Sequence, residues 1–126
     1  VNADGCHLGQ NDMNISKVKK ILKNKIIGVT CHNSIKLAKY ASSNGANYIS
    51  LGAFYKTKTK KVIHKASFKT LNKIKKLIKI PVVAIGGINH KNYKNLLLNK
   101  ADFLAISGYI WNNKKFKPHQ AIKNLI

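Results

Sequence analysis

The sequence predicts an α/β fold in which buried parallel strands alternate with helices. Short apolar runs rich in β-branched residues recur along the 126 residues, and each is followed by a polar turn and then by apolar residues at helical spacing. Strand starts recur about every 21 residues, except across one long loop. Strands of this kind, joined by helices, form parallel sheets with helical crossovers.

Five such strand–helix units can be placed along the chain. The predicted strands cover residues 6–9, 26–30, 48–52, 81–88 and 103–107. The predicted helices cover residues 15–23, 34–43, 67–78, the region around 93–97, and 118–125. Three of these helices begin at residues suited to cap an amino end, namely Asn14 or Ser16, Asn33 or Ser34, and Ser67. We expect residues 108–111 to be a loop.

The fourth strand carries the clearest single signal. Its apolar run starts at Pro81 and reads as a strand buried on both faces. It ends in Gly86 and Gly87, and a polar stretch that starts a helix follows directly. A strand, a glycine turn and a helix start together direct backbone N–H groups toward an anion, usually a phosphate. The simpler interpretation is a tight connection without a ligand.

The equal units and the absence of a dinucleotide-binding fingerprint favour a (β/α)8 barrel over a doubly wound sheet. Eight units need roughly 200 residues or more, whereas this chain has room for five. We therefore expect an N-terminally truncated piece of a TIM barrel. Residues 1–126 would form the C-terminal portion, about strands 4–8, of a single barrel domain.

The charge is strongly positive, at +21, and all basic residues are lysines. The lysines are spread over every predicted helix, and specific nucleic-acid recognition favours arginine, so we expect no nucleic-acid partner. No run of about 18 apolar residues is present, so we expect no membrane span. Cys6 and Cys31 form no metal-binding pair and read as reduced residues of a cytoplasmic protein.

The carboxyl ends of the predicted strands gather hydroxyl groups, backbone donors and one carboxylate. In barrels of this type the chemistry takes place at these ends. The set lacks a Ser-His-Asp triad and paired carboxylates, which argues against hydrolase and glycosidase chemistry. It suits a site that holds phosphates and, through Asp12, Mg²⁺. The candidates are Gln10, Asp12, Thr30, His32, Thr57, Thr59, Lys60, Gly86, Gly87 and Ser107.

Each candidate also has a structural interpretation. Asp12 would simply begin the next helix, where a negative charge is favourable. Residues 57–60 would be a solvated polar loop, and Ser107 would cap a turn. His7 reads as a hydrogen-bonded core histidine, and His32 as a turn residue or a proton donor at the mouth of the site.

Several motifs together resemble thiamine-phosphate synthases. They are Asp4 through Asp12, Gly28 through His32, Gly52 through Lys60, Ala84 through Ile88, and Ala101-Asp102 with Ile106-Ser107. The resemblance covers essentially the whole chain, in the order and spacing of that family. It implies a transferase that joins hydroxymethylpyrimidine diphosphate to thiazole phosphate, giving thiamine phosphate and diphosphate.

The resemblance also implies roles for individual residues. Asp12 would be a ligand of Mg²⁺, the expected cofactor. Thr30 and Lys60 would act in catalysis, with Thr30 near the diphosphate. The implied substrate-binding residues are Gln10, Thr57, Thr59, Lys60, Gly86, Gly87, Ile106 and Ser107. The partners would be these two small molecules, and a homo-oligomer stays open.

Two departures from the family matter. The loop after Gly52 has lost two prolines that the family usually carries, so its rigidity is in question. The family's first units, with a Gln-x-Arg-x-Lys diphosphate site and an Asn-Asp pair, have no counterpart in this chain. We therefore expect the chain alone to be poorly stable and inactive.

Three alternatives remain open. The first is a thiazole tautomerase of the same superfamily, with His32 as the proton shuttle. The second is another phosphate-binding barrel, such as an epimerase or isomerase. The third is a non-enzymatic basic module that binds anions.

Overall fold

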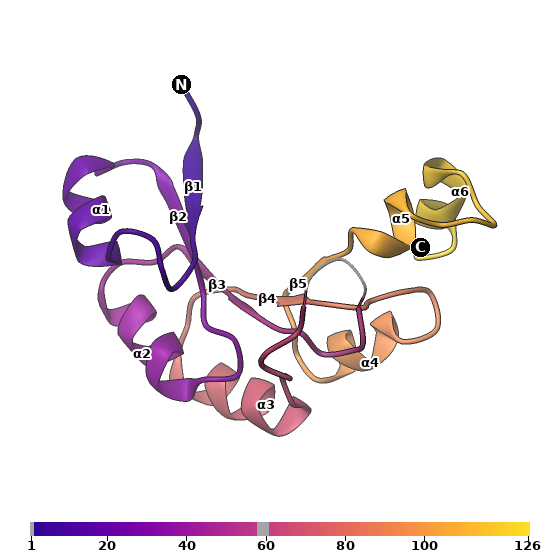
Figure 1. Cartoon of the computed structure of the whole chain (residues 1–126). Helices are drawn as coiled ribbons and strands as arrows, with labels where there is room; N and C mark the ends of the chain where they lie inside the picture. The colour runs from indigo at the N-terminus through magenta and orange to yellow at the C-terminus, as the bar shows by residue number, and fades with distance from the viewer. Residues whose placement is uncertain (1, 58–60) are drawn as a thin grey trace.

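The computed structural model describes residues 2–57 and 61–126, and it has an α/β fold around one parallel sheet. The sheet has five strands in the order β1-β2-β3-β4-β5, and all adjacent pairs are parallel. It curves into an open arc, with β1 at one edge and β5 at the other (Figure 1). The strands are β1 Gly5–Leu8, β2 Ile26–Thr30, β3 Tyr48–Leu51, β4 Val82–Ile85 and β5 Phe103–Ala105.

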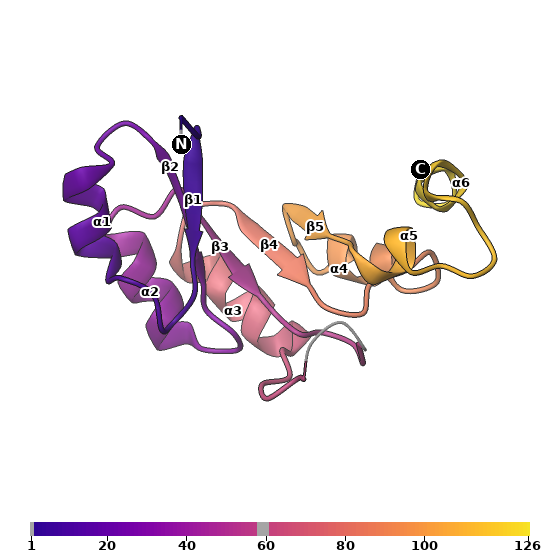
Figure 2. The same cartoon turned by 45° about the horizontal axis from the view of Figure 1, so that its top comes forward.

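Helices α1 to α4 lie along the convex side of the arc, while α5 and α6 lie beyond β5 (Figure 2). The predicted caps are confirmed where Asn14, Ser34 and Ser67 accept hydrogen bonds from backbone N–H groups of the following helices. The helices are α1 Ile15–Ile21, α2 Ile35–Ser43, α3 Phe68–Leu77, α4 Tyr93–Leu98, α5 Gly108–Trp111 and α6 Pro118–Lys123.

A repeated side-chain contact fixes neighbouring strands at their starts. Asn47 precedes β3, and its Oδ1 accepts the N–H of Ile27 in β2 at 2.9 Å. Asp102 precedes β5, and its Oδ2 accepts the N–H of Val82 in β4 at 2.7 Å. In both cases the backbone N–H of the Asn or Asp donates to the carbonyl of that same partner residue. The two-bond contact sets the register of the parallel pair.

The convex face of the sheet forms the core. Its side chains pack against the helices, and most of the large ones have no exposed surface. Leu71 and Ile74 of α3 and Leu96 of α4 close this layer from the helix side, each at 0% exposure. The sheet residues of this layer are Ile27, Ile49, Leu51, Val82 and Ala84, each at most 1% exposed.

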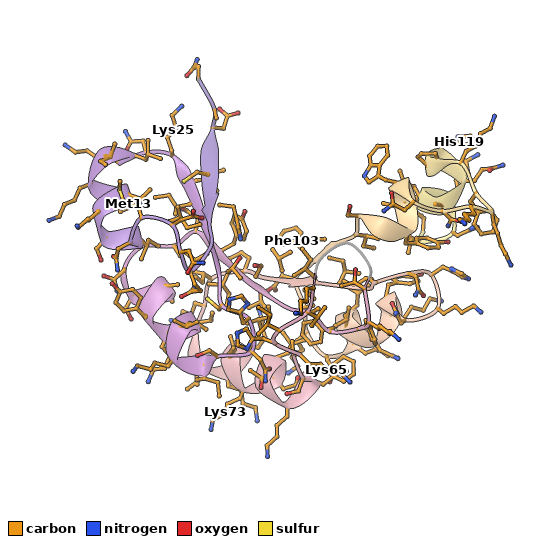
Figure 3. All side chains as sticks on the ribbon, viewed as in Figure 1. Met13, Lys25, Lys65, Lys73, Phe103 and His119 are labelled. Carbon is orange, nitrogen blue, oxygen red and sulfur yellow. The ribbon has the colours of Figure 1, made fainter. Side chains whose placement is uncertain are left out.

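The concave face is open, and here one prediction is wrong. We expected the fourth strand to be buried on both faces, but Ile85 is 43% exposed. Ile26 at 53% and Phe103 at 60% are exposed as well, because nothing in the described chain covers this side. Figure 3 shows Phe103 on the concave side of the arc and Lys73 of α3 pointing away from it.

The C-terminal end of the chain also differs from expectation. The fifth strand ends at Ala105, two residues earlier than predicted, and residues 108–111 form the short helix α5 rather than a loop. Two apolar residues of the last helices, Leu97 of α4 and Ile122 of α6, are 46% and 44% exposed. None of the helices in the described ranges is long and apolar enough to span a membrane.

Candidate functional site

The carboxyl ends of β1 and β2 bring Gln10 and Thr30 together. The side chain of Gln10 donates a hydrogen bond from Nε2 to the carbonyl oxygen of Thr30. Thr30 is the last residue of β2, and alternation along the strand places its side chain on the concave face. These two candidate residues therefore form one corner of the site.

Asp12 belongs to the same corner, in the loop between β1 and α1. Its Oδ2 accepts the backbone N–H of Gly9 at 2.7 Å, and its own N–H donates to the Gly9 carbonyl at 3.3 Å. Helix α1 begins three residues later, at Ile15, so Asp12 does not start that helix. Instead, the exposed carboxylate of Asp12 holds the loop through its contact with Gly9. Asp12 and Gln10 both line a small hollow of about 120 Å³.

His7 faces the concave side and contacts Thr30 directly. Its Nε2 lies 2.8 Å from the Thr30 Oγ1, and its Nδ1 lies 3.0 Å from the Tyr48 hydroxyl. The interpretation of His7 as a core histidine is wrong, because the residue is exposed on the open face of the sheet. Desolvation lowers the pKa of His7, although the nearby Asp12 charge acts in the opposite direction.

The long loop after β3 folds back on itself and on β4. Ala53 donates to the His64 carbonyl at 3.1 Å, and Ala66 donates to the Ala53 carbonyl at 2.9 Å. Thr57 lies in this loop beside a hollow of about 300 Å³. Three lysines, Lys56, Lys61 and Lys65, line the same hollow, which gives it the charge that an anion requires. The candidates Thr59 and Lys60 lie outside the described residues.

Gly86 and Gly87 form the turn after β4, and both have positive φ, at 102° and 65°. A Cβ on Gly86 would lie 2.4 Å from the Ala53 Cβ, and one on Gly87 would lie 2.4 Å from the Lys56 carbonyl oxygen. The glycines are therefore required for the long loop to pack against this turn. This contact brings Thr57, Gly86 and Gly87 into one region of the site.

Ser107 and Ile106 follow β5, next to the β4 turn. Ser107 precedes α5, and its carbonyl accepts the N–H groups of Ile110 and Trp111. Its side chain makes no capping hydrogen bond to the short helix α5, so the interpretation of Ser107 as the cap of a turn is not supported. Ile106 packs partly against the core and holds this segment in place.

His32 lies in the turn after β2, with φ of 51°. Its ring contacts that of His64 in the long loop, with centroids 4.7 Å apart. Burial and the neighbouring His64 lower the pKa of His32. Cys31, one residue earlier, is fully buried, and desolvation raises the pKa of its thiol to about 12, which makes it a structural residue rather than a nucleophile.

A single carboxylate of the chain lies at the carboxyl ends of the strands. Of the three acids, Asp4 and Asp102 precede strands at the amino ends of the sheet, and Asp12 alone follows a strand. Within residues 2–57 and 61–126, no group of three or more His, Cys, Asp or Glu side chains surrounds it. Mg²⁺ is commonly bound by one or two carboxylates plus phosphate oxygens, and one carboxylate is what this corner supplies.

Tyr48 and Ser50 are site residues that the sequence reasoning missed. Both belong to β3 and alternate onto the face that carries Thr30. Ser50 Oγ lies 3.4 Å from the Thr30 Oγ1 and 3.5 Å from the His7 Nε2. The period-two pattern of β3 was the available signal, because every second residue of a strand faces the same side.

Comparison with known proteins gives a consistent result. The family model for thiamine monophosphate synthase matches residues 1–110. A thiamine-phosphate synthase of Pelagibacter ubique (strain HTCC1062) is 67% identical over 125 residues, covering 99% of this chain and 60% of that protein. One of Clostridium acetobutylicum is 43% identical over 118 residues, covering 93% of this chain and 56% of that protein. The chain thus spans little more than half the length of these relatives.

Solved structures show the same likeness. A thiamine phosphate pyrophosphorylase from Pyrococcus furiosus superposes with a TM-score of 0.86 at 33% identity, over 98% of this chain and 58% of that one. A 3-hexulose-6-phosphate synthase superposes with a TM-score of 0.73 at 17% identity, over 98% of this chain and 61% of that one. The second likeness concerns the fold alone.

Proposed function

The chain belongs to the thiamine monophosphate synthase family, and we propose that it forms the last five βα units of a (β/α)8 barrel with thiamine-phosphate synthase activity. The reaction joins hydroxymethylpyrimidine diphosphate to a thiazole phosphate and releases diphosphate. The observation that carries the proposal is the 67% identity to a thiamine-phosphate synthase across 99% of the chain.

The open concave face supports the barrel. Three apolar residues of this face, Ile26, Ile85 and Phe103, are between 43% and 60% exposed. Large apolar side chains on the inner face of a curved parallel sheet are normally covered when the sheet closes. The remaining strands of a barrel would cover them and would pair with the free edges of β1 and β5.

The chemistry proposed for the site is to hold and neutralise a leaving diphosphate. Breaking the carbon–oxygen bond to diphosphate leaves a pyrimidine-methyl cation that the thiazole nitrogen attacks, so charge stabilisation at the leaving group contributes most. Thr30 would donate a hydrogen bond to the diphosphate, and Gln10 holds the Thr30 carbonyl. Mg²⁺ held by Asp12 would supply positive charge to the diphosphate oxygens.

The thiazole phosphate would bind at the other end of the site. The glycine turn after β4 and the hydroxyl of Ser107 occupy the last two βα turns, where barrels usually bind phosphate. The lysine-lined hollow beside Thr57 adjoins that turn, because Gly87 packs against Lys56. Lys60 and Thr59, with Ile106 on the apolar side, would complete the contacts.

The decisive experiment replaces Asp12 with Asn in the complete product of the gene. We expect Mg²⁺-dependent formation of thiamine phosphate to fall by roughly a hundredfold, because the metal loses its protein ligand. Asp4→Asn is the matched control, since Asp4 lies at the opposite end of the sheet, and it should keep near-normal activity. Full activity in the Asp12 variant would exclude this role for Asp12.

The 126-residue chain by itself should be inactive and poorly stable, because it lacks the family's first βα units, which carry part of the proposed diphosphate site. The measurement is product formation by the purified chain with both substrates and Mg²⁺. Measurable turnover would show that five units suffice and would remove the need for the missing ones.

A thiazole tautomerase is the second candidate, and the His32–His64 contact favours it. Burial and the neighbouring His64 lower the pKa of His32, so its neutral imidazole could accept a proton as the first step of a shuttle. Such an enzyme would tolerate Asp12→Asn and lose activity in His32→Asn, which is the reverse of the synthase pattern. An epimerase or isomerase, or a basic anion-binding module, would be favoured if the unaltered protein showed neither activity.

The expected surroundings of the protein belong to the same proposal. We expect a cytoplasmic enzyme whose partners are the two small substrates, without a nucleic-acid or membrane partner. The +21 charge would draw anionic substrates toward the site. Salt-dependent binding to generic DNA without any response to the pyrimidine diphosphate would overturn this part. Sedimentation of the complete gene product would decide whether it forms a homo-oligomer.

A further inference from the structure

Four side chains from three strands form one hydrogen-bonded cluster on the concave face. His7 of β1 lies between Tyr48 of β3, at 3.0 Å from its Nδ1, and Thr30 of β2, at 2.8 Å from its Nε2. Ser50 of β3 donates to the Thr30 Oγ1 at 3.4 Å. Thr30 therefore contacts two polar side chains, His7 and Ser50, and lies itself at the carboxyl end of β2.

Gly28 makes this cluster possible. It lies on β2 directly opposite Tyr48 in the parallel pair. A Cβ at Gly28 would lie 2.1 Å from the Tyr48 Cζ, so any side chain here would displace the ring. With glycine at this position, the Tyr48 ring crosses β2 and its hydroxyl reaches His7 on the next strand.

The protons of the cluster can be counted. A neutral imidazole donates from one ring nitrogen and accepts at the other. If Tyr48 donates to Nδ1, then the Nε2–H donates to Thr30. Thr30 then accepts from both His7 and Ser50, which fills its two lone pairs, and its own proton stays available for a group at the strand ends.

The opposite tautomer gives the opposite result. With the proton on Nδ1, His7 donates to the Tyr48 hydroxyl, and Nε2 accepts a hydrogen bond from the Thr30 hydroxyl. The Thr30 oxygen would then turn a lone pair toward the strand ends, where it repels an anion. The direction of one hydrogen bond from Tyr48 thus decides whether Thr30 donates to a diphosphate or repels it.

We propose that His7 is a positioning residue, held by Tyr48 as the Nε2–H tautomer, which makes the Thr30 hydroxyl a dedicated donor to the anionic group bound at the strand ends. The identity of that group as a diphosphate rests on the proposed function. The hydrogen-bond direction does not, because the tautomer of His7 can be measured in the protein without any bound substrate.

The first test is spectroscopic and uses the complete gene product labelled with ¹⁵N in histidine. The imidazole shifts of His7 should report a protonated Nε2 and an unprotonated Nδ1 at pH 7.5. Tyr48→Phe should shift the population toward the Nδ1–H form, because the donor to Nδ1 is gone. Tyr55→Phe is the matched control, since that hydroxyl donates to the Asn92 carbonyl and it should leave the His7 shifts unchanged. An Nδ1–H form in the unaltered protein, or no response to Tyr48→Phe, would overturn the proposal.

The second test asks whether His7 acts only through Thr30. The probe is inorganic diphosphate with Mg²⁺, and the measurement is its dissociation constant by calorimetry. His7→Met and Thr30→Val should each weaken binding roughly tenfold, as expected for one hydrogen bond to a charged group. The double variant should be no weaker than Thr30→Val alone, and His7→Gln, whose amide can donate in place of Nε2–H, should recover most of the affinity. Additive losses would overturn the proposal.

The two tests separate this inference from the proposed function. If the protein makes no thiamine phosphate, but the tautomer and the non-additive losses are as described, the synthase assignment fails and the positioning role of His7 stands. If the protein is an active synthase and the losses add, the positioning role fails alone. Circular dichroism of each variant confirms that the fold is retained.

Discussion

The two faces of the sheet differ more than any other two regions of this molecule. The convex face is sealed by helices, and Ile27, Ile49 and Val82 on it have no exposed surface. The concave face combines exposed apolar residues, such as Phe103, with the polar cluster around His7. The convex face thus holds the structure together, while the concave face is open and carries the candidate site.

The two faces should also differ in how much the truncation of a side chain destabilises the fold. On the convex face a lost methylene group leaves a cavity inside a closed layer. On the concave face the same loss costs little as long as the side stays open to water. Stability measurements on the two faces therefore test whether the barrel closes.

The largest effect should come from Ile49→Ala on the convex face. Ile49 has no exposed surface, and removing three buried carbon atoms should lower the free energy of unfolding by about 3 kcal/mol. Urea unfolding of the complete gene product measures this change. A loss below about 1 kcal/mol would show that the helix layer is less tightly packed than its burial indicates.

A somewhat smaller effect is expected for Ile85→Ala on the concave face. Although Ile85 is 43% exposed in this chain, a closed barrel would bury it, and the loss in the complete gene product should then be about 2 kcal/mol. The same urea unfolding applies. A loss no larger than that of an exposed substitution, below about 0.5 kcal/mol, would mean that the concave face stays open.

A third change concerns the strand starts, which belong to neither face. Burial acts to raise the pKa of Asp102, but hydrogen bonds from Lys75 and from the Val82 N–H outweigh it and lower the pKa. Asp102→Asn removes the charge and leaves a neutral acceptor for Val82. Because the Lys75 pair is partly exposed, we expect a loss of only about 1 kcal/mol in unfolding free energy. Lys75→Met should lower the free energy of unfolding by the same amount. If its loss is much smaller, the effect of Asp102→Asn comes from a weaker hydrogen bond to the Val82 N–H and not from the ion pair.

The smallest effect should be a pH dependence that comes mainly from the concave side. Desolvation lowers the pKa of His7 below 6.5, so the folded chain binds fewer protons than the unfolded chain. The neutral His7 contributes its full share to the free energy of unfolding above pH 6.5. This share is lost as the pH falls through the pKa that His7 has in the folded chain. The unfolding free energy should therefore decrease between pH 7 and pH 5. His7→Gln should flatten this slope, and a slope of unchanged size would assign it to other histidines such as His32.

Most of the fold followed from the sequence, because its signals are local. Strand β2 was predicted with its observed bounds, and Ser34 and Ser67 cap helices as expected, since each depends on a short pattern of neighbouring residues. The exposure of Ile85 was missed, because an apolar strand sequence does not indicate whether other parts of the protein cover its second face. Helix α5 was missed because its four residues offer no periodicity.

The site was predictable in part for a similar reason. Parallel strands bring their carboxyl ends to one edge of the sheet. Residues that follow β1 and β2 in the sequence were therefore expected to lie near each other, and Gln10 does contact Thr30. The contact of His7 with Tyr48 depends on the missing side chain of Gly28 on the strand between them, which is a three-dimensional relation. Roles for Asp12, Thr57 and Ser107 stay predictions.

The contact that joins the starts of β3 and β5 to the strands before them has a consequence for the free edge of β1. Asn47 holds β2, and Asp102 holds β4, so β3 and β5 each begin with a side-chain contact to the preceding strand. Asp4 occupies the same place before β1, and its carbonyl already accepts the N–H of Ile26. A strand added along the free edge of β1 would bring its first N–H within reach of the Asp4 carboxylate. We therefore expect Asp4 to set the register of any strand that pairs with this edge of β1.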